Sequence, residues 1–431
     1  MSNTGSASNA NWLYDSSVNS NVEAKLRQFL VELGNADKIL GIQVCAYKDG
    51  KVIIDTAAGV LGKDDPRPVQ PDTLFPCFSV TKGVTAGMVH WLADKGKLKL
   101  DENVTNIWPE FGTNGKDQIK VNHILNHTSG LHNVLGTVAE DDPTLFCNFD
   151  ECLKHIVVAA PETEPGHFQF YHSLSYGWLC GGIIEKASGK KFQEILEEAF
   201  VRPLNVEGEF YIGIPPGVES RLATVTIDAD VISWYVKLIE TIDFVTTKSS
   251  FSSISNIATI SNTLNVRRAI IPAANGHFSA RALARYYATL VDGGVGPPRH
   301  SSSLPPLGSH PHNPMFPSKK TDEVETKIFN NSKEKIHDAF LGRGDYKDLI
   351  LPNGMFGLGF NTAKTTDGSI IGISHAGFGG STGYCDINNR FAMSVTFNKL
   401  HSGELTGEIV RFVCSELDLP VPQEYAAGSL V

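Results

Sequence analysis

The chain has 431 residues, and its 37 Lys and Arg against 47 Asp and Glu give a formal net charge of −10. Hydrophobic residues make up 41% and charged residues 19%, the proportions of a globular protein, so disorder over most of the length is excluded. The acidic balance, without a long Lys/Arg run, excludes the electrostatic footprint of nucleic-acid binding and leaves small molecules or other proteins as partners.

The N-terminus and the cysteines indicate a compartment. Residues 1–11 are polar and uncharged, unlike a signal peptide, and no stretch reaches about 18 uninterrupted apolar residues. The seven cysteines are odd in number and form no Cys-x-x-Cys pair, which favours buried reduced thiols over a disulfide framework or a zinc ribbon. We therefore expect a cytoplasmic protein without a membrane span.

The first elements are a helix and a hairpin. After a polar tail of about twenty residues, the apolar spacing of Val22–Gly34 predicts a helix. Two β-prone runs, Gly41–Tyr47 and Lys51–Asp55, flank Asp49-Gly50 and predict a hairpin with a type I′ turn. A helix is expected from about Ser79 to Lys97, and the chain then stays mostly helical to about residue 290.

The C-terminal part returns to strands. Gly293 to Thr321 is rich in Pro, Ser, His and Gly, which is typical of a flexible loop. The last hundred residues predict short strands and a final helix: Gly357–Ala363, Ser369–Ser374, Gly383–Ile387, Phe391–Asn398 and Gly403–Leu417.

Strands at both ends with helices between them predict an α/β (α+β) fold. One antiparallel sheet is built from N- and C-terminal strands and flanked by helices, with an inserted, mostly helical domain. The expected boundaries are a flexible tail at 1–20, a sheet domain at 21–75 and 345–431, a helical domain at 76–292, and a flexible loop or insertion at 293–344.

A Ser-x-x-Lys pattern, Ser79 to Lys82, stands at the start of the long helix. Residues three apart share a helix face, so the Lys82 amine would lie one turn from the Ser79 hydroxyl. A lysine desolvated at a helix N-terminus can lose its proton near neutral pH and activate a serine. Because Ser188–Lys191 and Ser332–Lys335 repeat the pattern, the motif alone is weak, and an N-cap serine with a surface lysine is the alternative.

Two further segments carry candidate chemistry. Tyr171, before a helix, can act as an acid or base if cations lower its pKa, and Ser173 can point to the same side and hydrogen-bond the lysine. The alternative is an aromatic residue that anchors a helix start. Downstream, His375 and Gly377 open a glycine-rich turn after a strand, where an exposed edge can supply an oxyanion N–H; a structural histidine in a glycine-rich loop is the alternative.

His123 and His127 have the spacing of a zinc-binding helix but lack its glutamate and an obvious third ligand. Packing or capping roles are therefore expected for both histidines, and no metal site is expected. Nucleotide-binding glycine motifs are absent from the sequence as well.

Ser79, Tyr171 and His375 thus fall, in this order, on a helix start, a helical-domain loop and a strand edge. This arrangement resembles the serine β-lactamase and penicillin-binding-protein superfamily, in particular its class C-like, β-lactamase-related esterase branch, over residues 22–417. Some plant proteins of that branch are similar. Two more segments look like motifs of the branch: Leu125–Leu131 and Gly357–Phe360.

The resemblance implies a serine β-lactamase-like fold and a set of roles. Ser79 would be the acylated nucleophile, Lys82 and Tyr171 would share the proton transfers, and the backbone N–H groups of Ser79 and Phe378 would form the oxyanion hole. No metal or organic cofactor is required. The remaining site residues would support substrate binding: Ser173, His375 and Gly377.

Two departures from class C β-lactamases bear on the substrate. Those enzymes carry Tyr-x-Asn and Lys-Thr-Gly where this chain has Tyr171-His172-Ser173 and His375-Ala376-Gly377. A histidine with a pKa of about 6.5 is mostly neutral at neutral pH and binds a carboxylate less well than lysine. We therefore expect neutral ester or thioester substrates rather than β-lactams or peptides.

Three functions stay open at this point. The first is a serine hydrolase that cleaves carboxylic esters through an acyl-serine. The second is an acyltransferase on the same scaffold, in which a small-molecule alcohol or amine replaces water. The third is a catalytically retired binding scaffold, which the joint presence of Ser79, Lys82, Tyr171 and the glycine-rich turn disfavours.

Overall fold

The computed structural model describes residues 12–136, 142–241, 256–298, 304–311 and 327–428. Its first elements are helix α1 (Asn21–Asn35) and the hairpin of β1 (Gly41–Lys48) and β2 (Lys51–Gly62). Asp49 and Gly50 both have positive φ, at 51° and 75°. Two positive φ values in a two-residue turn are the mark of type I′, so the predicted helix and hairpin are confirmed.

The central sheet has seven strands in the order β3-β2-β1-β11-β10-β9-β8, and every neighbouring pair is antiparallel. The N-terminal strand β1 pairs with the C-terminal strand β11, with Val44 opposite Val395. The predicted sheet built from both ends of the chain is therefore confirmed. The remaining strands are β3 (Asp65–Pro68), β8 (Asn361–Lys364), β9 (Ile370–Ala376), β10 (Thr382–Asp386) and β11 (Phe391–Phe397).

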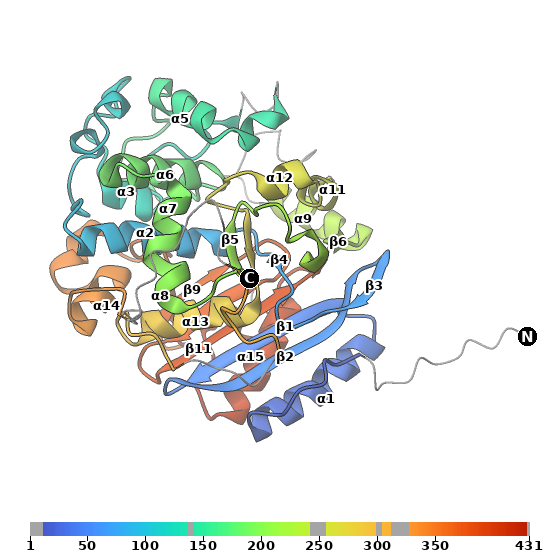
Figure 1. Ribbon diagram of the computed structural model, residues 1–431. Helices are drawn as coiled ribbons and strands as arrows, with labels where there is room; N and C mark the ends of the chain where they lie inside the picture. Colours follow the sequence, from blue (N-terminus) through green and yellow to red (C-terminus); the bar gives the residue numbers. More distant parts are fainter. Residues whose placement is uncertain (1–11, 137–141, 242–255, 299–303, 312–326, 429–431) are drawn as a thin grey trace, which may run out of the picture.

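Helices cover both faces of this sheet, which is why β1 and β11 are buried along almost their whole length. On one face, α1 packs beside α15 (Glu404–Glu416) through leucine, isoleucine and valine side chains. On the other face, α13 (Ala280–Val291) crosses β1, β10 and β11. In Figure 1, α1 lies on the opposite side of the sheet from α2 (Val80–Asp94), α3 (Val121–Leu125) and α6 (Ser175–Ser188).

The region between the two halves of the sheet is mostly helical, as predicted, but it also holds short strands. Phe75–Pro76 (β4), Gly276–Phe278 (β7) and Phe210–Ile212 (β5) form a small sheet in the order β4-β7-β5. Strands of two or three residues carry too little pattern to be read from sequence. The other elements here are α5 (Phe149–Val158), α7 (Phe192–Leu196), α8 (Arg202–Leu204), β6 (Thr226–Ile227), α9 (Ala229–Thr241), α11 (Ile257–Ser261) and α12 (Leu264–Arg268).

Two segments differ from the expectation of flexible chain. Residues 12–14 of the predicted tail lie along β2, because the Tyr14 N–H donates to Ala57 O and the Gly59 N–H donates to Trp12 O. Within 293–344, the chain forms α14 (Lys333–Leu341) with a serine N-cap at Ser332. Residues 1–11, 299–303 and 312–326 of these two segments lie outside the described residues, and the boundaries of the domains stay a prediction.

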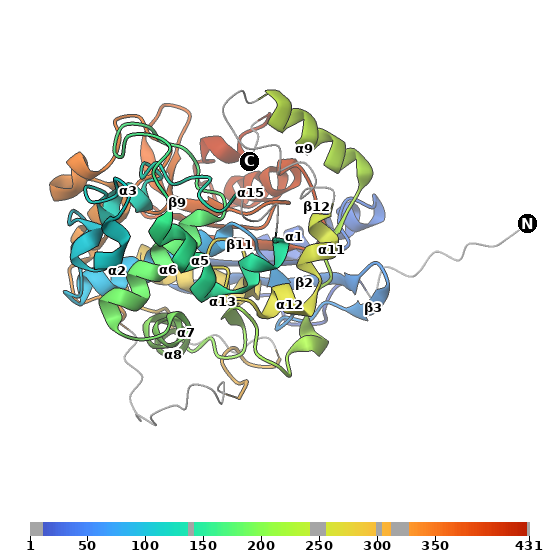
Figure 2. The same cartoon turned by 90° about the horizontal axis from the view of Figure 1, so that it is seen from above.

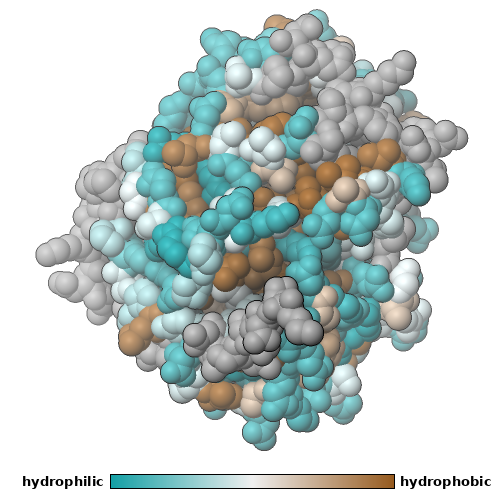
Figure 3. Space-filling view, turned by 90° about the vertical axis from the view of Figure 1, so that its right-hand side faces the viewer, coloured by the Kyte–Doolittle hydropathy of each residue, from teal (hydrophilic) through white to brown (hydrophobic). Residues whose placement is uncertain are grey.

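The outer surface is mixed in character. Figure 2 shows α9 at the edge of the molecule, beyond α15 and the short strand β12 (Lys399–Leu400). On the face seen in Figure 3, hydrophobic residues lie between hydrophilic ones in a band across the middle. Within the described part of the chain, no helix combines the length and the apolar character that a bilayer crossing requires.

Candidate functional site

The Ser79 hydroxyl stands on a strained turn at the start of α2. Phe78, directly before it, has φ of 46°, a left-handed conformation that costs energy for any residue other than glycine. Ser79 occupies the N-cap position, yet its side chain makes no capping hydrogen bond. The Oγ atom is therefore not used to cap the helix, which argues against the structural interpretation of this serine.

Lys82 lies one turn further along α2 and is fully buried. Its Nζ is 3.0 Å from Ser79 Oγ and 3.0 Å from the backbone oxygen of Ala273. Burial lowers the pKa of Lys82 from 10.5 to about 7, because the low-dielectric surroundings disfavour the ammonium. A substantial fraction of Lys82 is thus neutral near pH 7 and able to accept a proton, as the motif predicted.

Tyr171 lies next to both Ser79 and Lys82. Its side chain hydrogen-bonds Ser79, and Lys82 Nζ lies 4.8 Å from the centre of its ring. The sequence interpretation made the role of Tyr171 conditional on nearby cations that lower its pKa, and none does so among the described residues: although the residue is 37% exposed, desolvation of its hydroxyl raises the pKa, and the hydrogen bond with Ser79 opposes that effect. Tyr171 is therefore a neutral phenol that can donate a proton, while Lys82 is the group suited to accept one.

The glycine-rich turn after β9 approaches Ser79 through its backbone. A Cβ atom on Gly377 would overlap the backbone oxygen of Cys77, two residues before Ser79, so this contact requires glycine. The N–H groups of Ser79 and Phe378 donate no hydrogen bond within the residues that the structure describes. Both donors remain available for an oxyanion, as the resemblance implies.

Tyr235 of α9 holds the same turn from outside, a contact that the sequence did not predict. Its ring stacks on Phe378 at 4.2 Å, and its hydroxyl accepts from the Gly379 N–H at 3.3 Å and donates to His401 O at 3.0 Å. Phe378 also meets Phe78 edge to face at 5.8 Å. The aromatic group thus joins the turn to the residue before the candidate nucleophile.

His375 is buried at the end of β9. Its Nδ1 is 3.0 Å from Ala376 O, and because a carbonyl oxygen only accepts, Nδ1 carries the proton. Burial lowers the pKa of His375 to about 3, and the neighbouring Lys82 adds to this effect. The ring is therefore neutral at every physiological pH, which agrees with the expected loss of a carboxylate-binding cation at this position.

Ser173 does not occupy the expected place. It is exposed, and within the described residues no hydrogen bond joins it to Lys82. Ala273 O supplies the second contact of Lys82 instead. The two-residue spacing from Tyr171 did not determine the direction of the serine, because the backbone bends at Ser173 and Leu174 before α6 begins at Ser175.

His127 and His172 form a hydrogen-bonded group next to Tyr171 that the sequence did not predict. His127 has φ of 63°, and its Nδ1 accepts from the His172 N–H at 3.1 Å. His172 Nδ1 lies 2.6 Å from Phe170 O and therefore donates, so its Nε2 accepts from the Ser129 hydroxyl at 2.7 Å. These bonds fix the loop that carries Tyr171.

Among the described residues, no group of three or more His, Cys, Asp or Glu is placed to hold a metal ion. Both histidines of the zinc-like spacing are engaged elsewhere: His123 Nδ1 accepts from the Lys120 N–H, and His127 binds the His172 backbone. These are the capping and packing roles that the sequence favoured.

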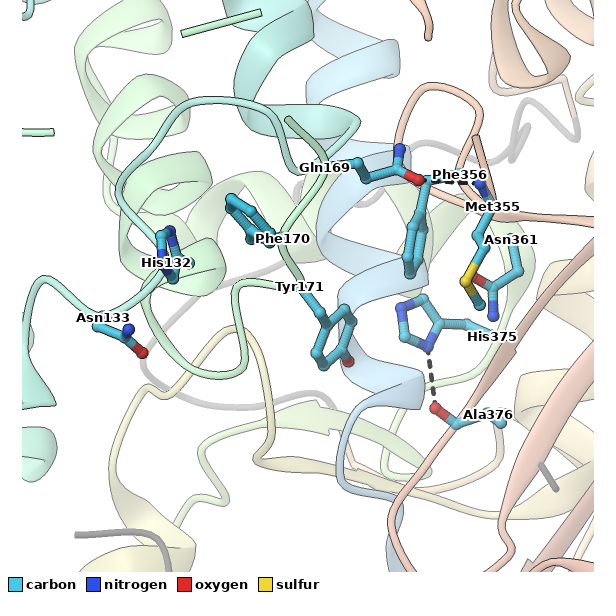
Figure 4. A pocket seen from close by; sticks show the side chains of 10 residues that line it. All are labelled: His132, Asn133, Gln169, Phe170, Tyr171, Met355, Phe356, Asn361, His375 and Ala376. Atoms are coloured by element: carbon cyan, nitrogen blue, oxygen red, sulfur yellow. Dashed lines mark hydrogen bonds between the residues drawn. The ribbon is translucent and has the colours of Figure 1, made fainter. Parts of the chain in front are cut away.

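A pocket of about 550 Å³ opens above Tyr171 and His375. In Figure 4, Tyr171, Phe356 and His375 face one another around it, with Gln169 and Met355 at the rim. None of its lining residues is Asp, Glu, Lys or Arg, and burial lowers the pKa of His132, which favours its neutral form. The lining residues are His132, Asn133, Gln169, Phe170, Tyr171, Met355, Phe356, Asn361, His375 and Ala376.

The beta-lactamase family model matches residues 26–411, which is most of the chain. The chain belongs to the beta-lactamase family. It is 28% identical over 374 residues to the esterase/beta-lactamase LipL of Mycobacterium tuberculosis, covering 84% of this chain and 78% of LipL. It is 27% identical over 194 residues to esterase EstB of Burkholderia gladioli, covering 42% of this chain and 49% of EstB.

A solved family VIII carboxylesterase superimposes with a TM-score of 0.68 at 23% identity, covering 90% of this chain and 94% of that one. This likeness shows a shared fold. The predicted family and the predicted antiparallel sheet with an inserted helical region are both confirmed.

Proposed function

We propose that this protein is a serine hydrolase that cleaves small, uncharged carboxylic esters or thioesters through an acyl intermediate on Ser79. The observation that carries the proposal is the Ser79 hydroxyl, unused as a helix cap and 3.0 Å from the fully buried Lys82 amine. The relatives LipL, named an esterase/beta-lactamase, and EstB, named an esterase, support this reaction class.

In the first step, neutral Lys82 accepts the Ser79 hydroxyl proton while Oγ bonds to the ester carbonyl carbon. The carbonyl oxygen becomes an oxyanion, and the N–H groups of Ser79 and Phe378 stabilise it. When the C–O bond to the alcohol breaks, Tyr171 donates a proton to the leaving oxygen and regains it from protonated Lys82. Water then attacks the acyl-serine by the same steps in reverse and releases the acid.

The pocket supports an uncharged substrate. It is lined by aromatic rings, amides and neutral histidines, and His375 stands where class C β-lactamases have a lysine. A carboxylate brought into such surroundings would lose its hydration without gaining a cationic partner. We also infer a reducing compartment, because all seven cysteines are unpaired and six of them are buried.

The test compares a neutral ester, p-nitrophenyl acetate, with the anionic β-lactam nitrocefin, on wild type and Ser79→Ala. We expect turnover of the ester by wild type, loss of that turnover in Ser79→Ala, and little turnover of nitrocefin. Efficient nitrocefin hydrolysis would contradict the substrate class. Addition of alcohols or amines during ester turnover then reports acyl transfer, because an acylated acceptor replaces the free acid.

A further inference from the structure

The segment Pro272-Ala273 lies against α2 on the side of the candidate base. Lys82 Nζ donates to Ala273 O at 3.0 Å, and Thr85 Oγ1 donates to Pro272 O at 2.6 Å. Ser79, Lys82 and Thr85 are spaced three residues apart and therefore share one face of α2. The same face thus presents the nucleophile, the base and a hydroxyl that fixes the segment that the base contacts.

The Ala273 carbonyl matters because it can only accept a hydrogen bond. A neutral lysine amine has two N–H donors and one lone pair. When one N–H is committed to Ala273 O, the rotation of the amine is restricted and its lone pair can be directed at the Ser79 proton. Without that carbonyl, the amine is free to turn an N–H toward Ser79 Oγ, an orientation in which it cannot accept the proton.

Gly177 of α6 also lies directly against the segment. A Cβ atom at this position would overlap the backbone nitrogen of Ala273 and would crowd the carbonyl carbon of Pro272. Helix α6 therefore approaches the segment through bare backbone, and any side chain here would push Ala273 out of place. The segment thus contacts both the Thr85 hydroxyl on α2 and the Gly177 backbone on α6.

We propose that Thr85 and Gly177 are positioning residues, which act on catalysis by holding the Ala273 carbonyl against the Lys82 amine. Neither residue contacts Ser79 or lines the pocket in the described structure. The inference rests on the proposed serine-hydrolase function, because it assigns these residues to the orientation of the base.

The first test replaces Thr85 by valine, which keeps the shape and removes the hydroxyl, and by serine, which keeps the hydroxyl. With p-nitrophenyl acetate, Thr85→Val is expected to lower kcat about fivefold to tenfold, the effect of one neutral hydrogen bond, with little change in KM. Thr85→Ser is expected to restore kcat. An unchanged kcat in Thr85→Val, or the same loss in Thr85→Ser, would overturn the proposal.

The second test uses two glycines of the same helix. A Cβ atom on Gly182 would overlap the Trp108 ring as severely as one on Gly177 overlaps Ala273, but Trp108 is not among the residues that line the pocket above Tyr171 and His375. Gly177→Ala is expected to lower kcat much more than Gly182→Ala does, even where the two substitutions lower the melting temperature by the same amount. Equal losses of kcat would show that disturbance of α6 alone accounts for the effect.

The rate of labelling by a fluorophosphonate separates failure of this inference from failure of the proposed function. This probe reports the reactivity of Ser79 without any ester substrate. Slower labelling of Thr85→Val than of wild type and Thr85→Ser supports the inference. Equal labelling of an active wild type and Thr85→Val refutes the positioning role alone, whereas a wild type that neither labels nor hydrolyses esters refutes both.

Discussion

Replacement of Lys82 by arginine is the perturbation that examines the role of the candidate base most closely. A guanidinium stays protonated at any accessible pH and cannot accept the Ser79 proton. In wild type, by contrast, burial brings the pKa of Lys82 down to about 7. Because the neutral amine is the active form, activity should rise with pH through this value, and this rising limb should be lost in Lys82→Arg.

The magnitude follows from the pKa values. At pH 7, a lysine with a pKa of 10.5 is neutral in only about three molecules in ten thousand, whereas one with a pKa of about 7 is neutral in about half. Burial therefore increases the neutral fraction roughly a thousandfold. We expect Lys82→Arg to lower kcat/KM by a factor of that order, since removal of a general base costs about 10²–10⁴ in rate.

The assay is the pH dependence of kcat/KM for p-nitrophenyl acetate from about pH 5 to about pH 9, with spontaneous hydrolysis subtracted. Lys82→Met, a neutral side chain of similar length, serves as the control for the loss of charge and should be as inactive as Lys82→Arg. A rise in kcat/KM centred above pH 9, or a rise near pH 7 that persists in Lys82→Arg, would refute the reasoning.

Three further changes have defined outcomes. Tyr171→Phe keeps the ring packing and removes the proton donor, so kcat should fall about a hundredfold with an unchanged melting temperature; near-normal kcat would exclude the phenol from the proton transfers. His375→Lys places a cation beside the pocket, and the ratio of nitrocefin to p-nitrophenyl acetate turnover should rise about tenfold; a constant ratio would show that charge at this position does not select the substrate. Six of the seven cysteines are buried and only Cys147 is partly accessible, so a thiol reagent should modify one cysteine in the native protein and all seven in denaturant; fewer in denaturant would indicate disulfides.

The parts of this structure that depend on local sequence were predictable. Asp49-Gly50 determines its turn by itself, because both residues tolerate positive φ. Ser79 and Lys82 are brought together by the period of one helix, so the distance between them follows once the helix is recognised. That strands from both ends of the chain share one antiparallel sheet follows from their positions in the sequence, whereas the pairing of β1 with β11 and its register do not.

The rest depends on contacts between segments far apart in the chain. Ala273 is 191 residues from Lys82, and a backbone carbonyl leaves no mark in the sequence. The desolvation that raises the pKa of Tyr171 depends on the packing of segments distant in the chain, so the sequence left the direction of this shift open. Tyr235 meets Phe378 only because α9 folds over the glycine-rich turn, and no spacing in the sequence predicts that contact.

The central claim is that Ser79 is an activated nucleophile, and intact-mass measurement after treatment with a fluorophosphonate tests it most directly. A serine that lies 3.0 Å from a buried amine should form one covalent adduct, and Ser79→Ala should form none. A single adduct on wild type that is absent from the folded Ser79→Ala protein is the predicted result. An unmodified wild type, or an adduct that persists in Ser79→Ala, would contradict the account.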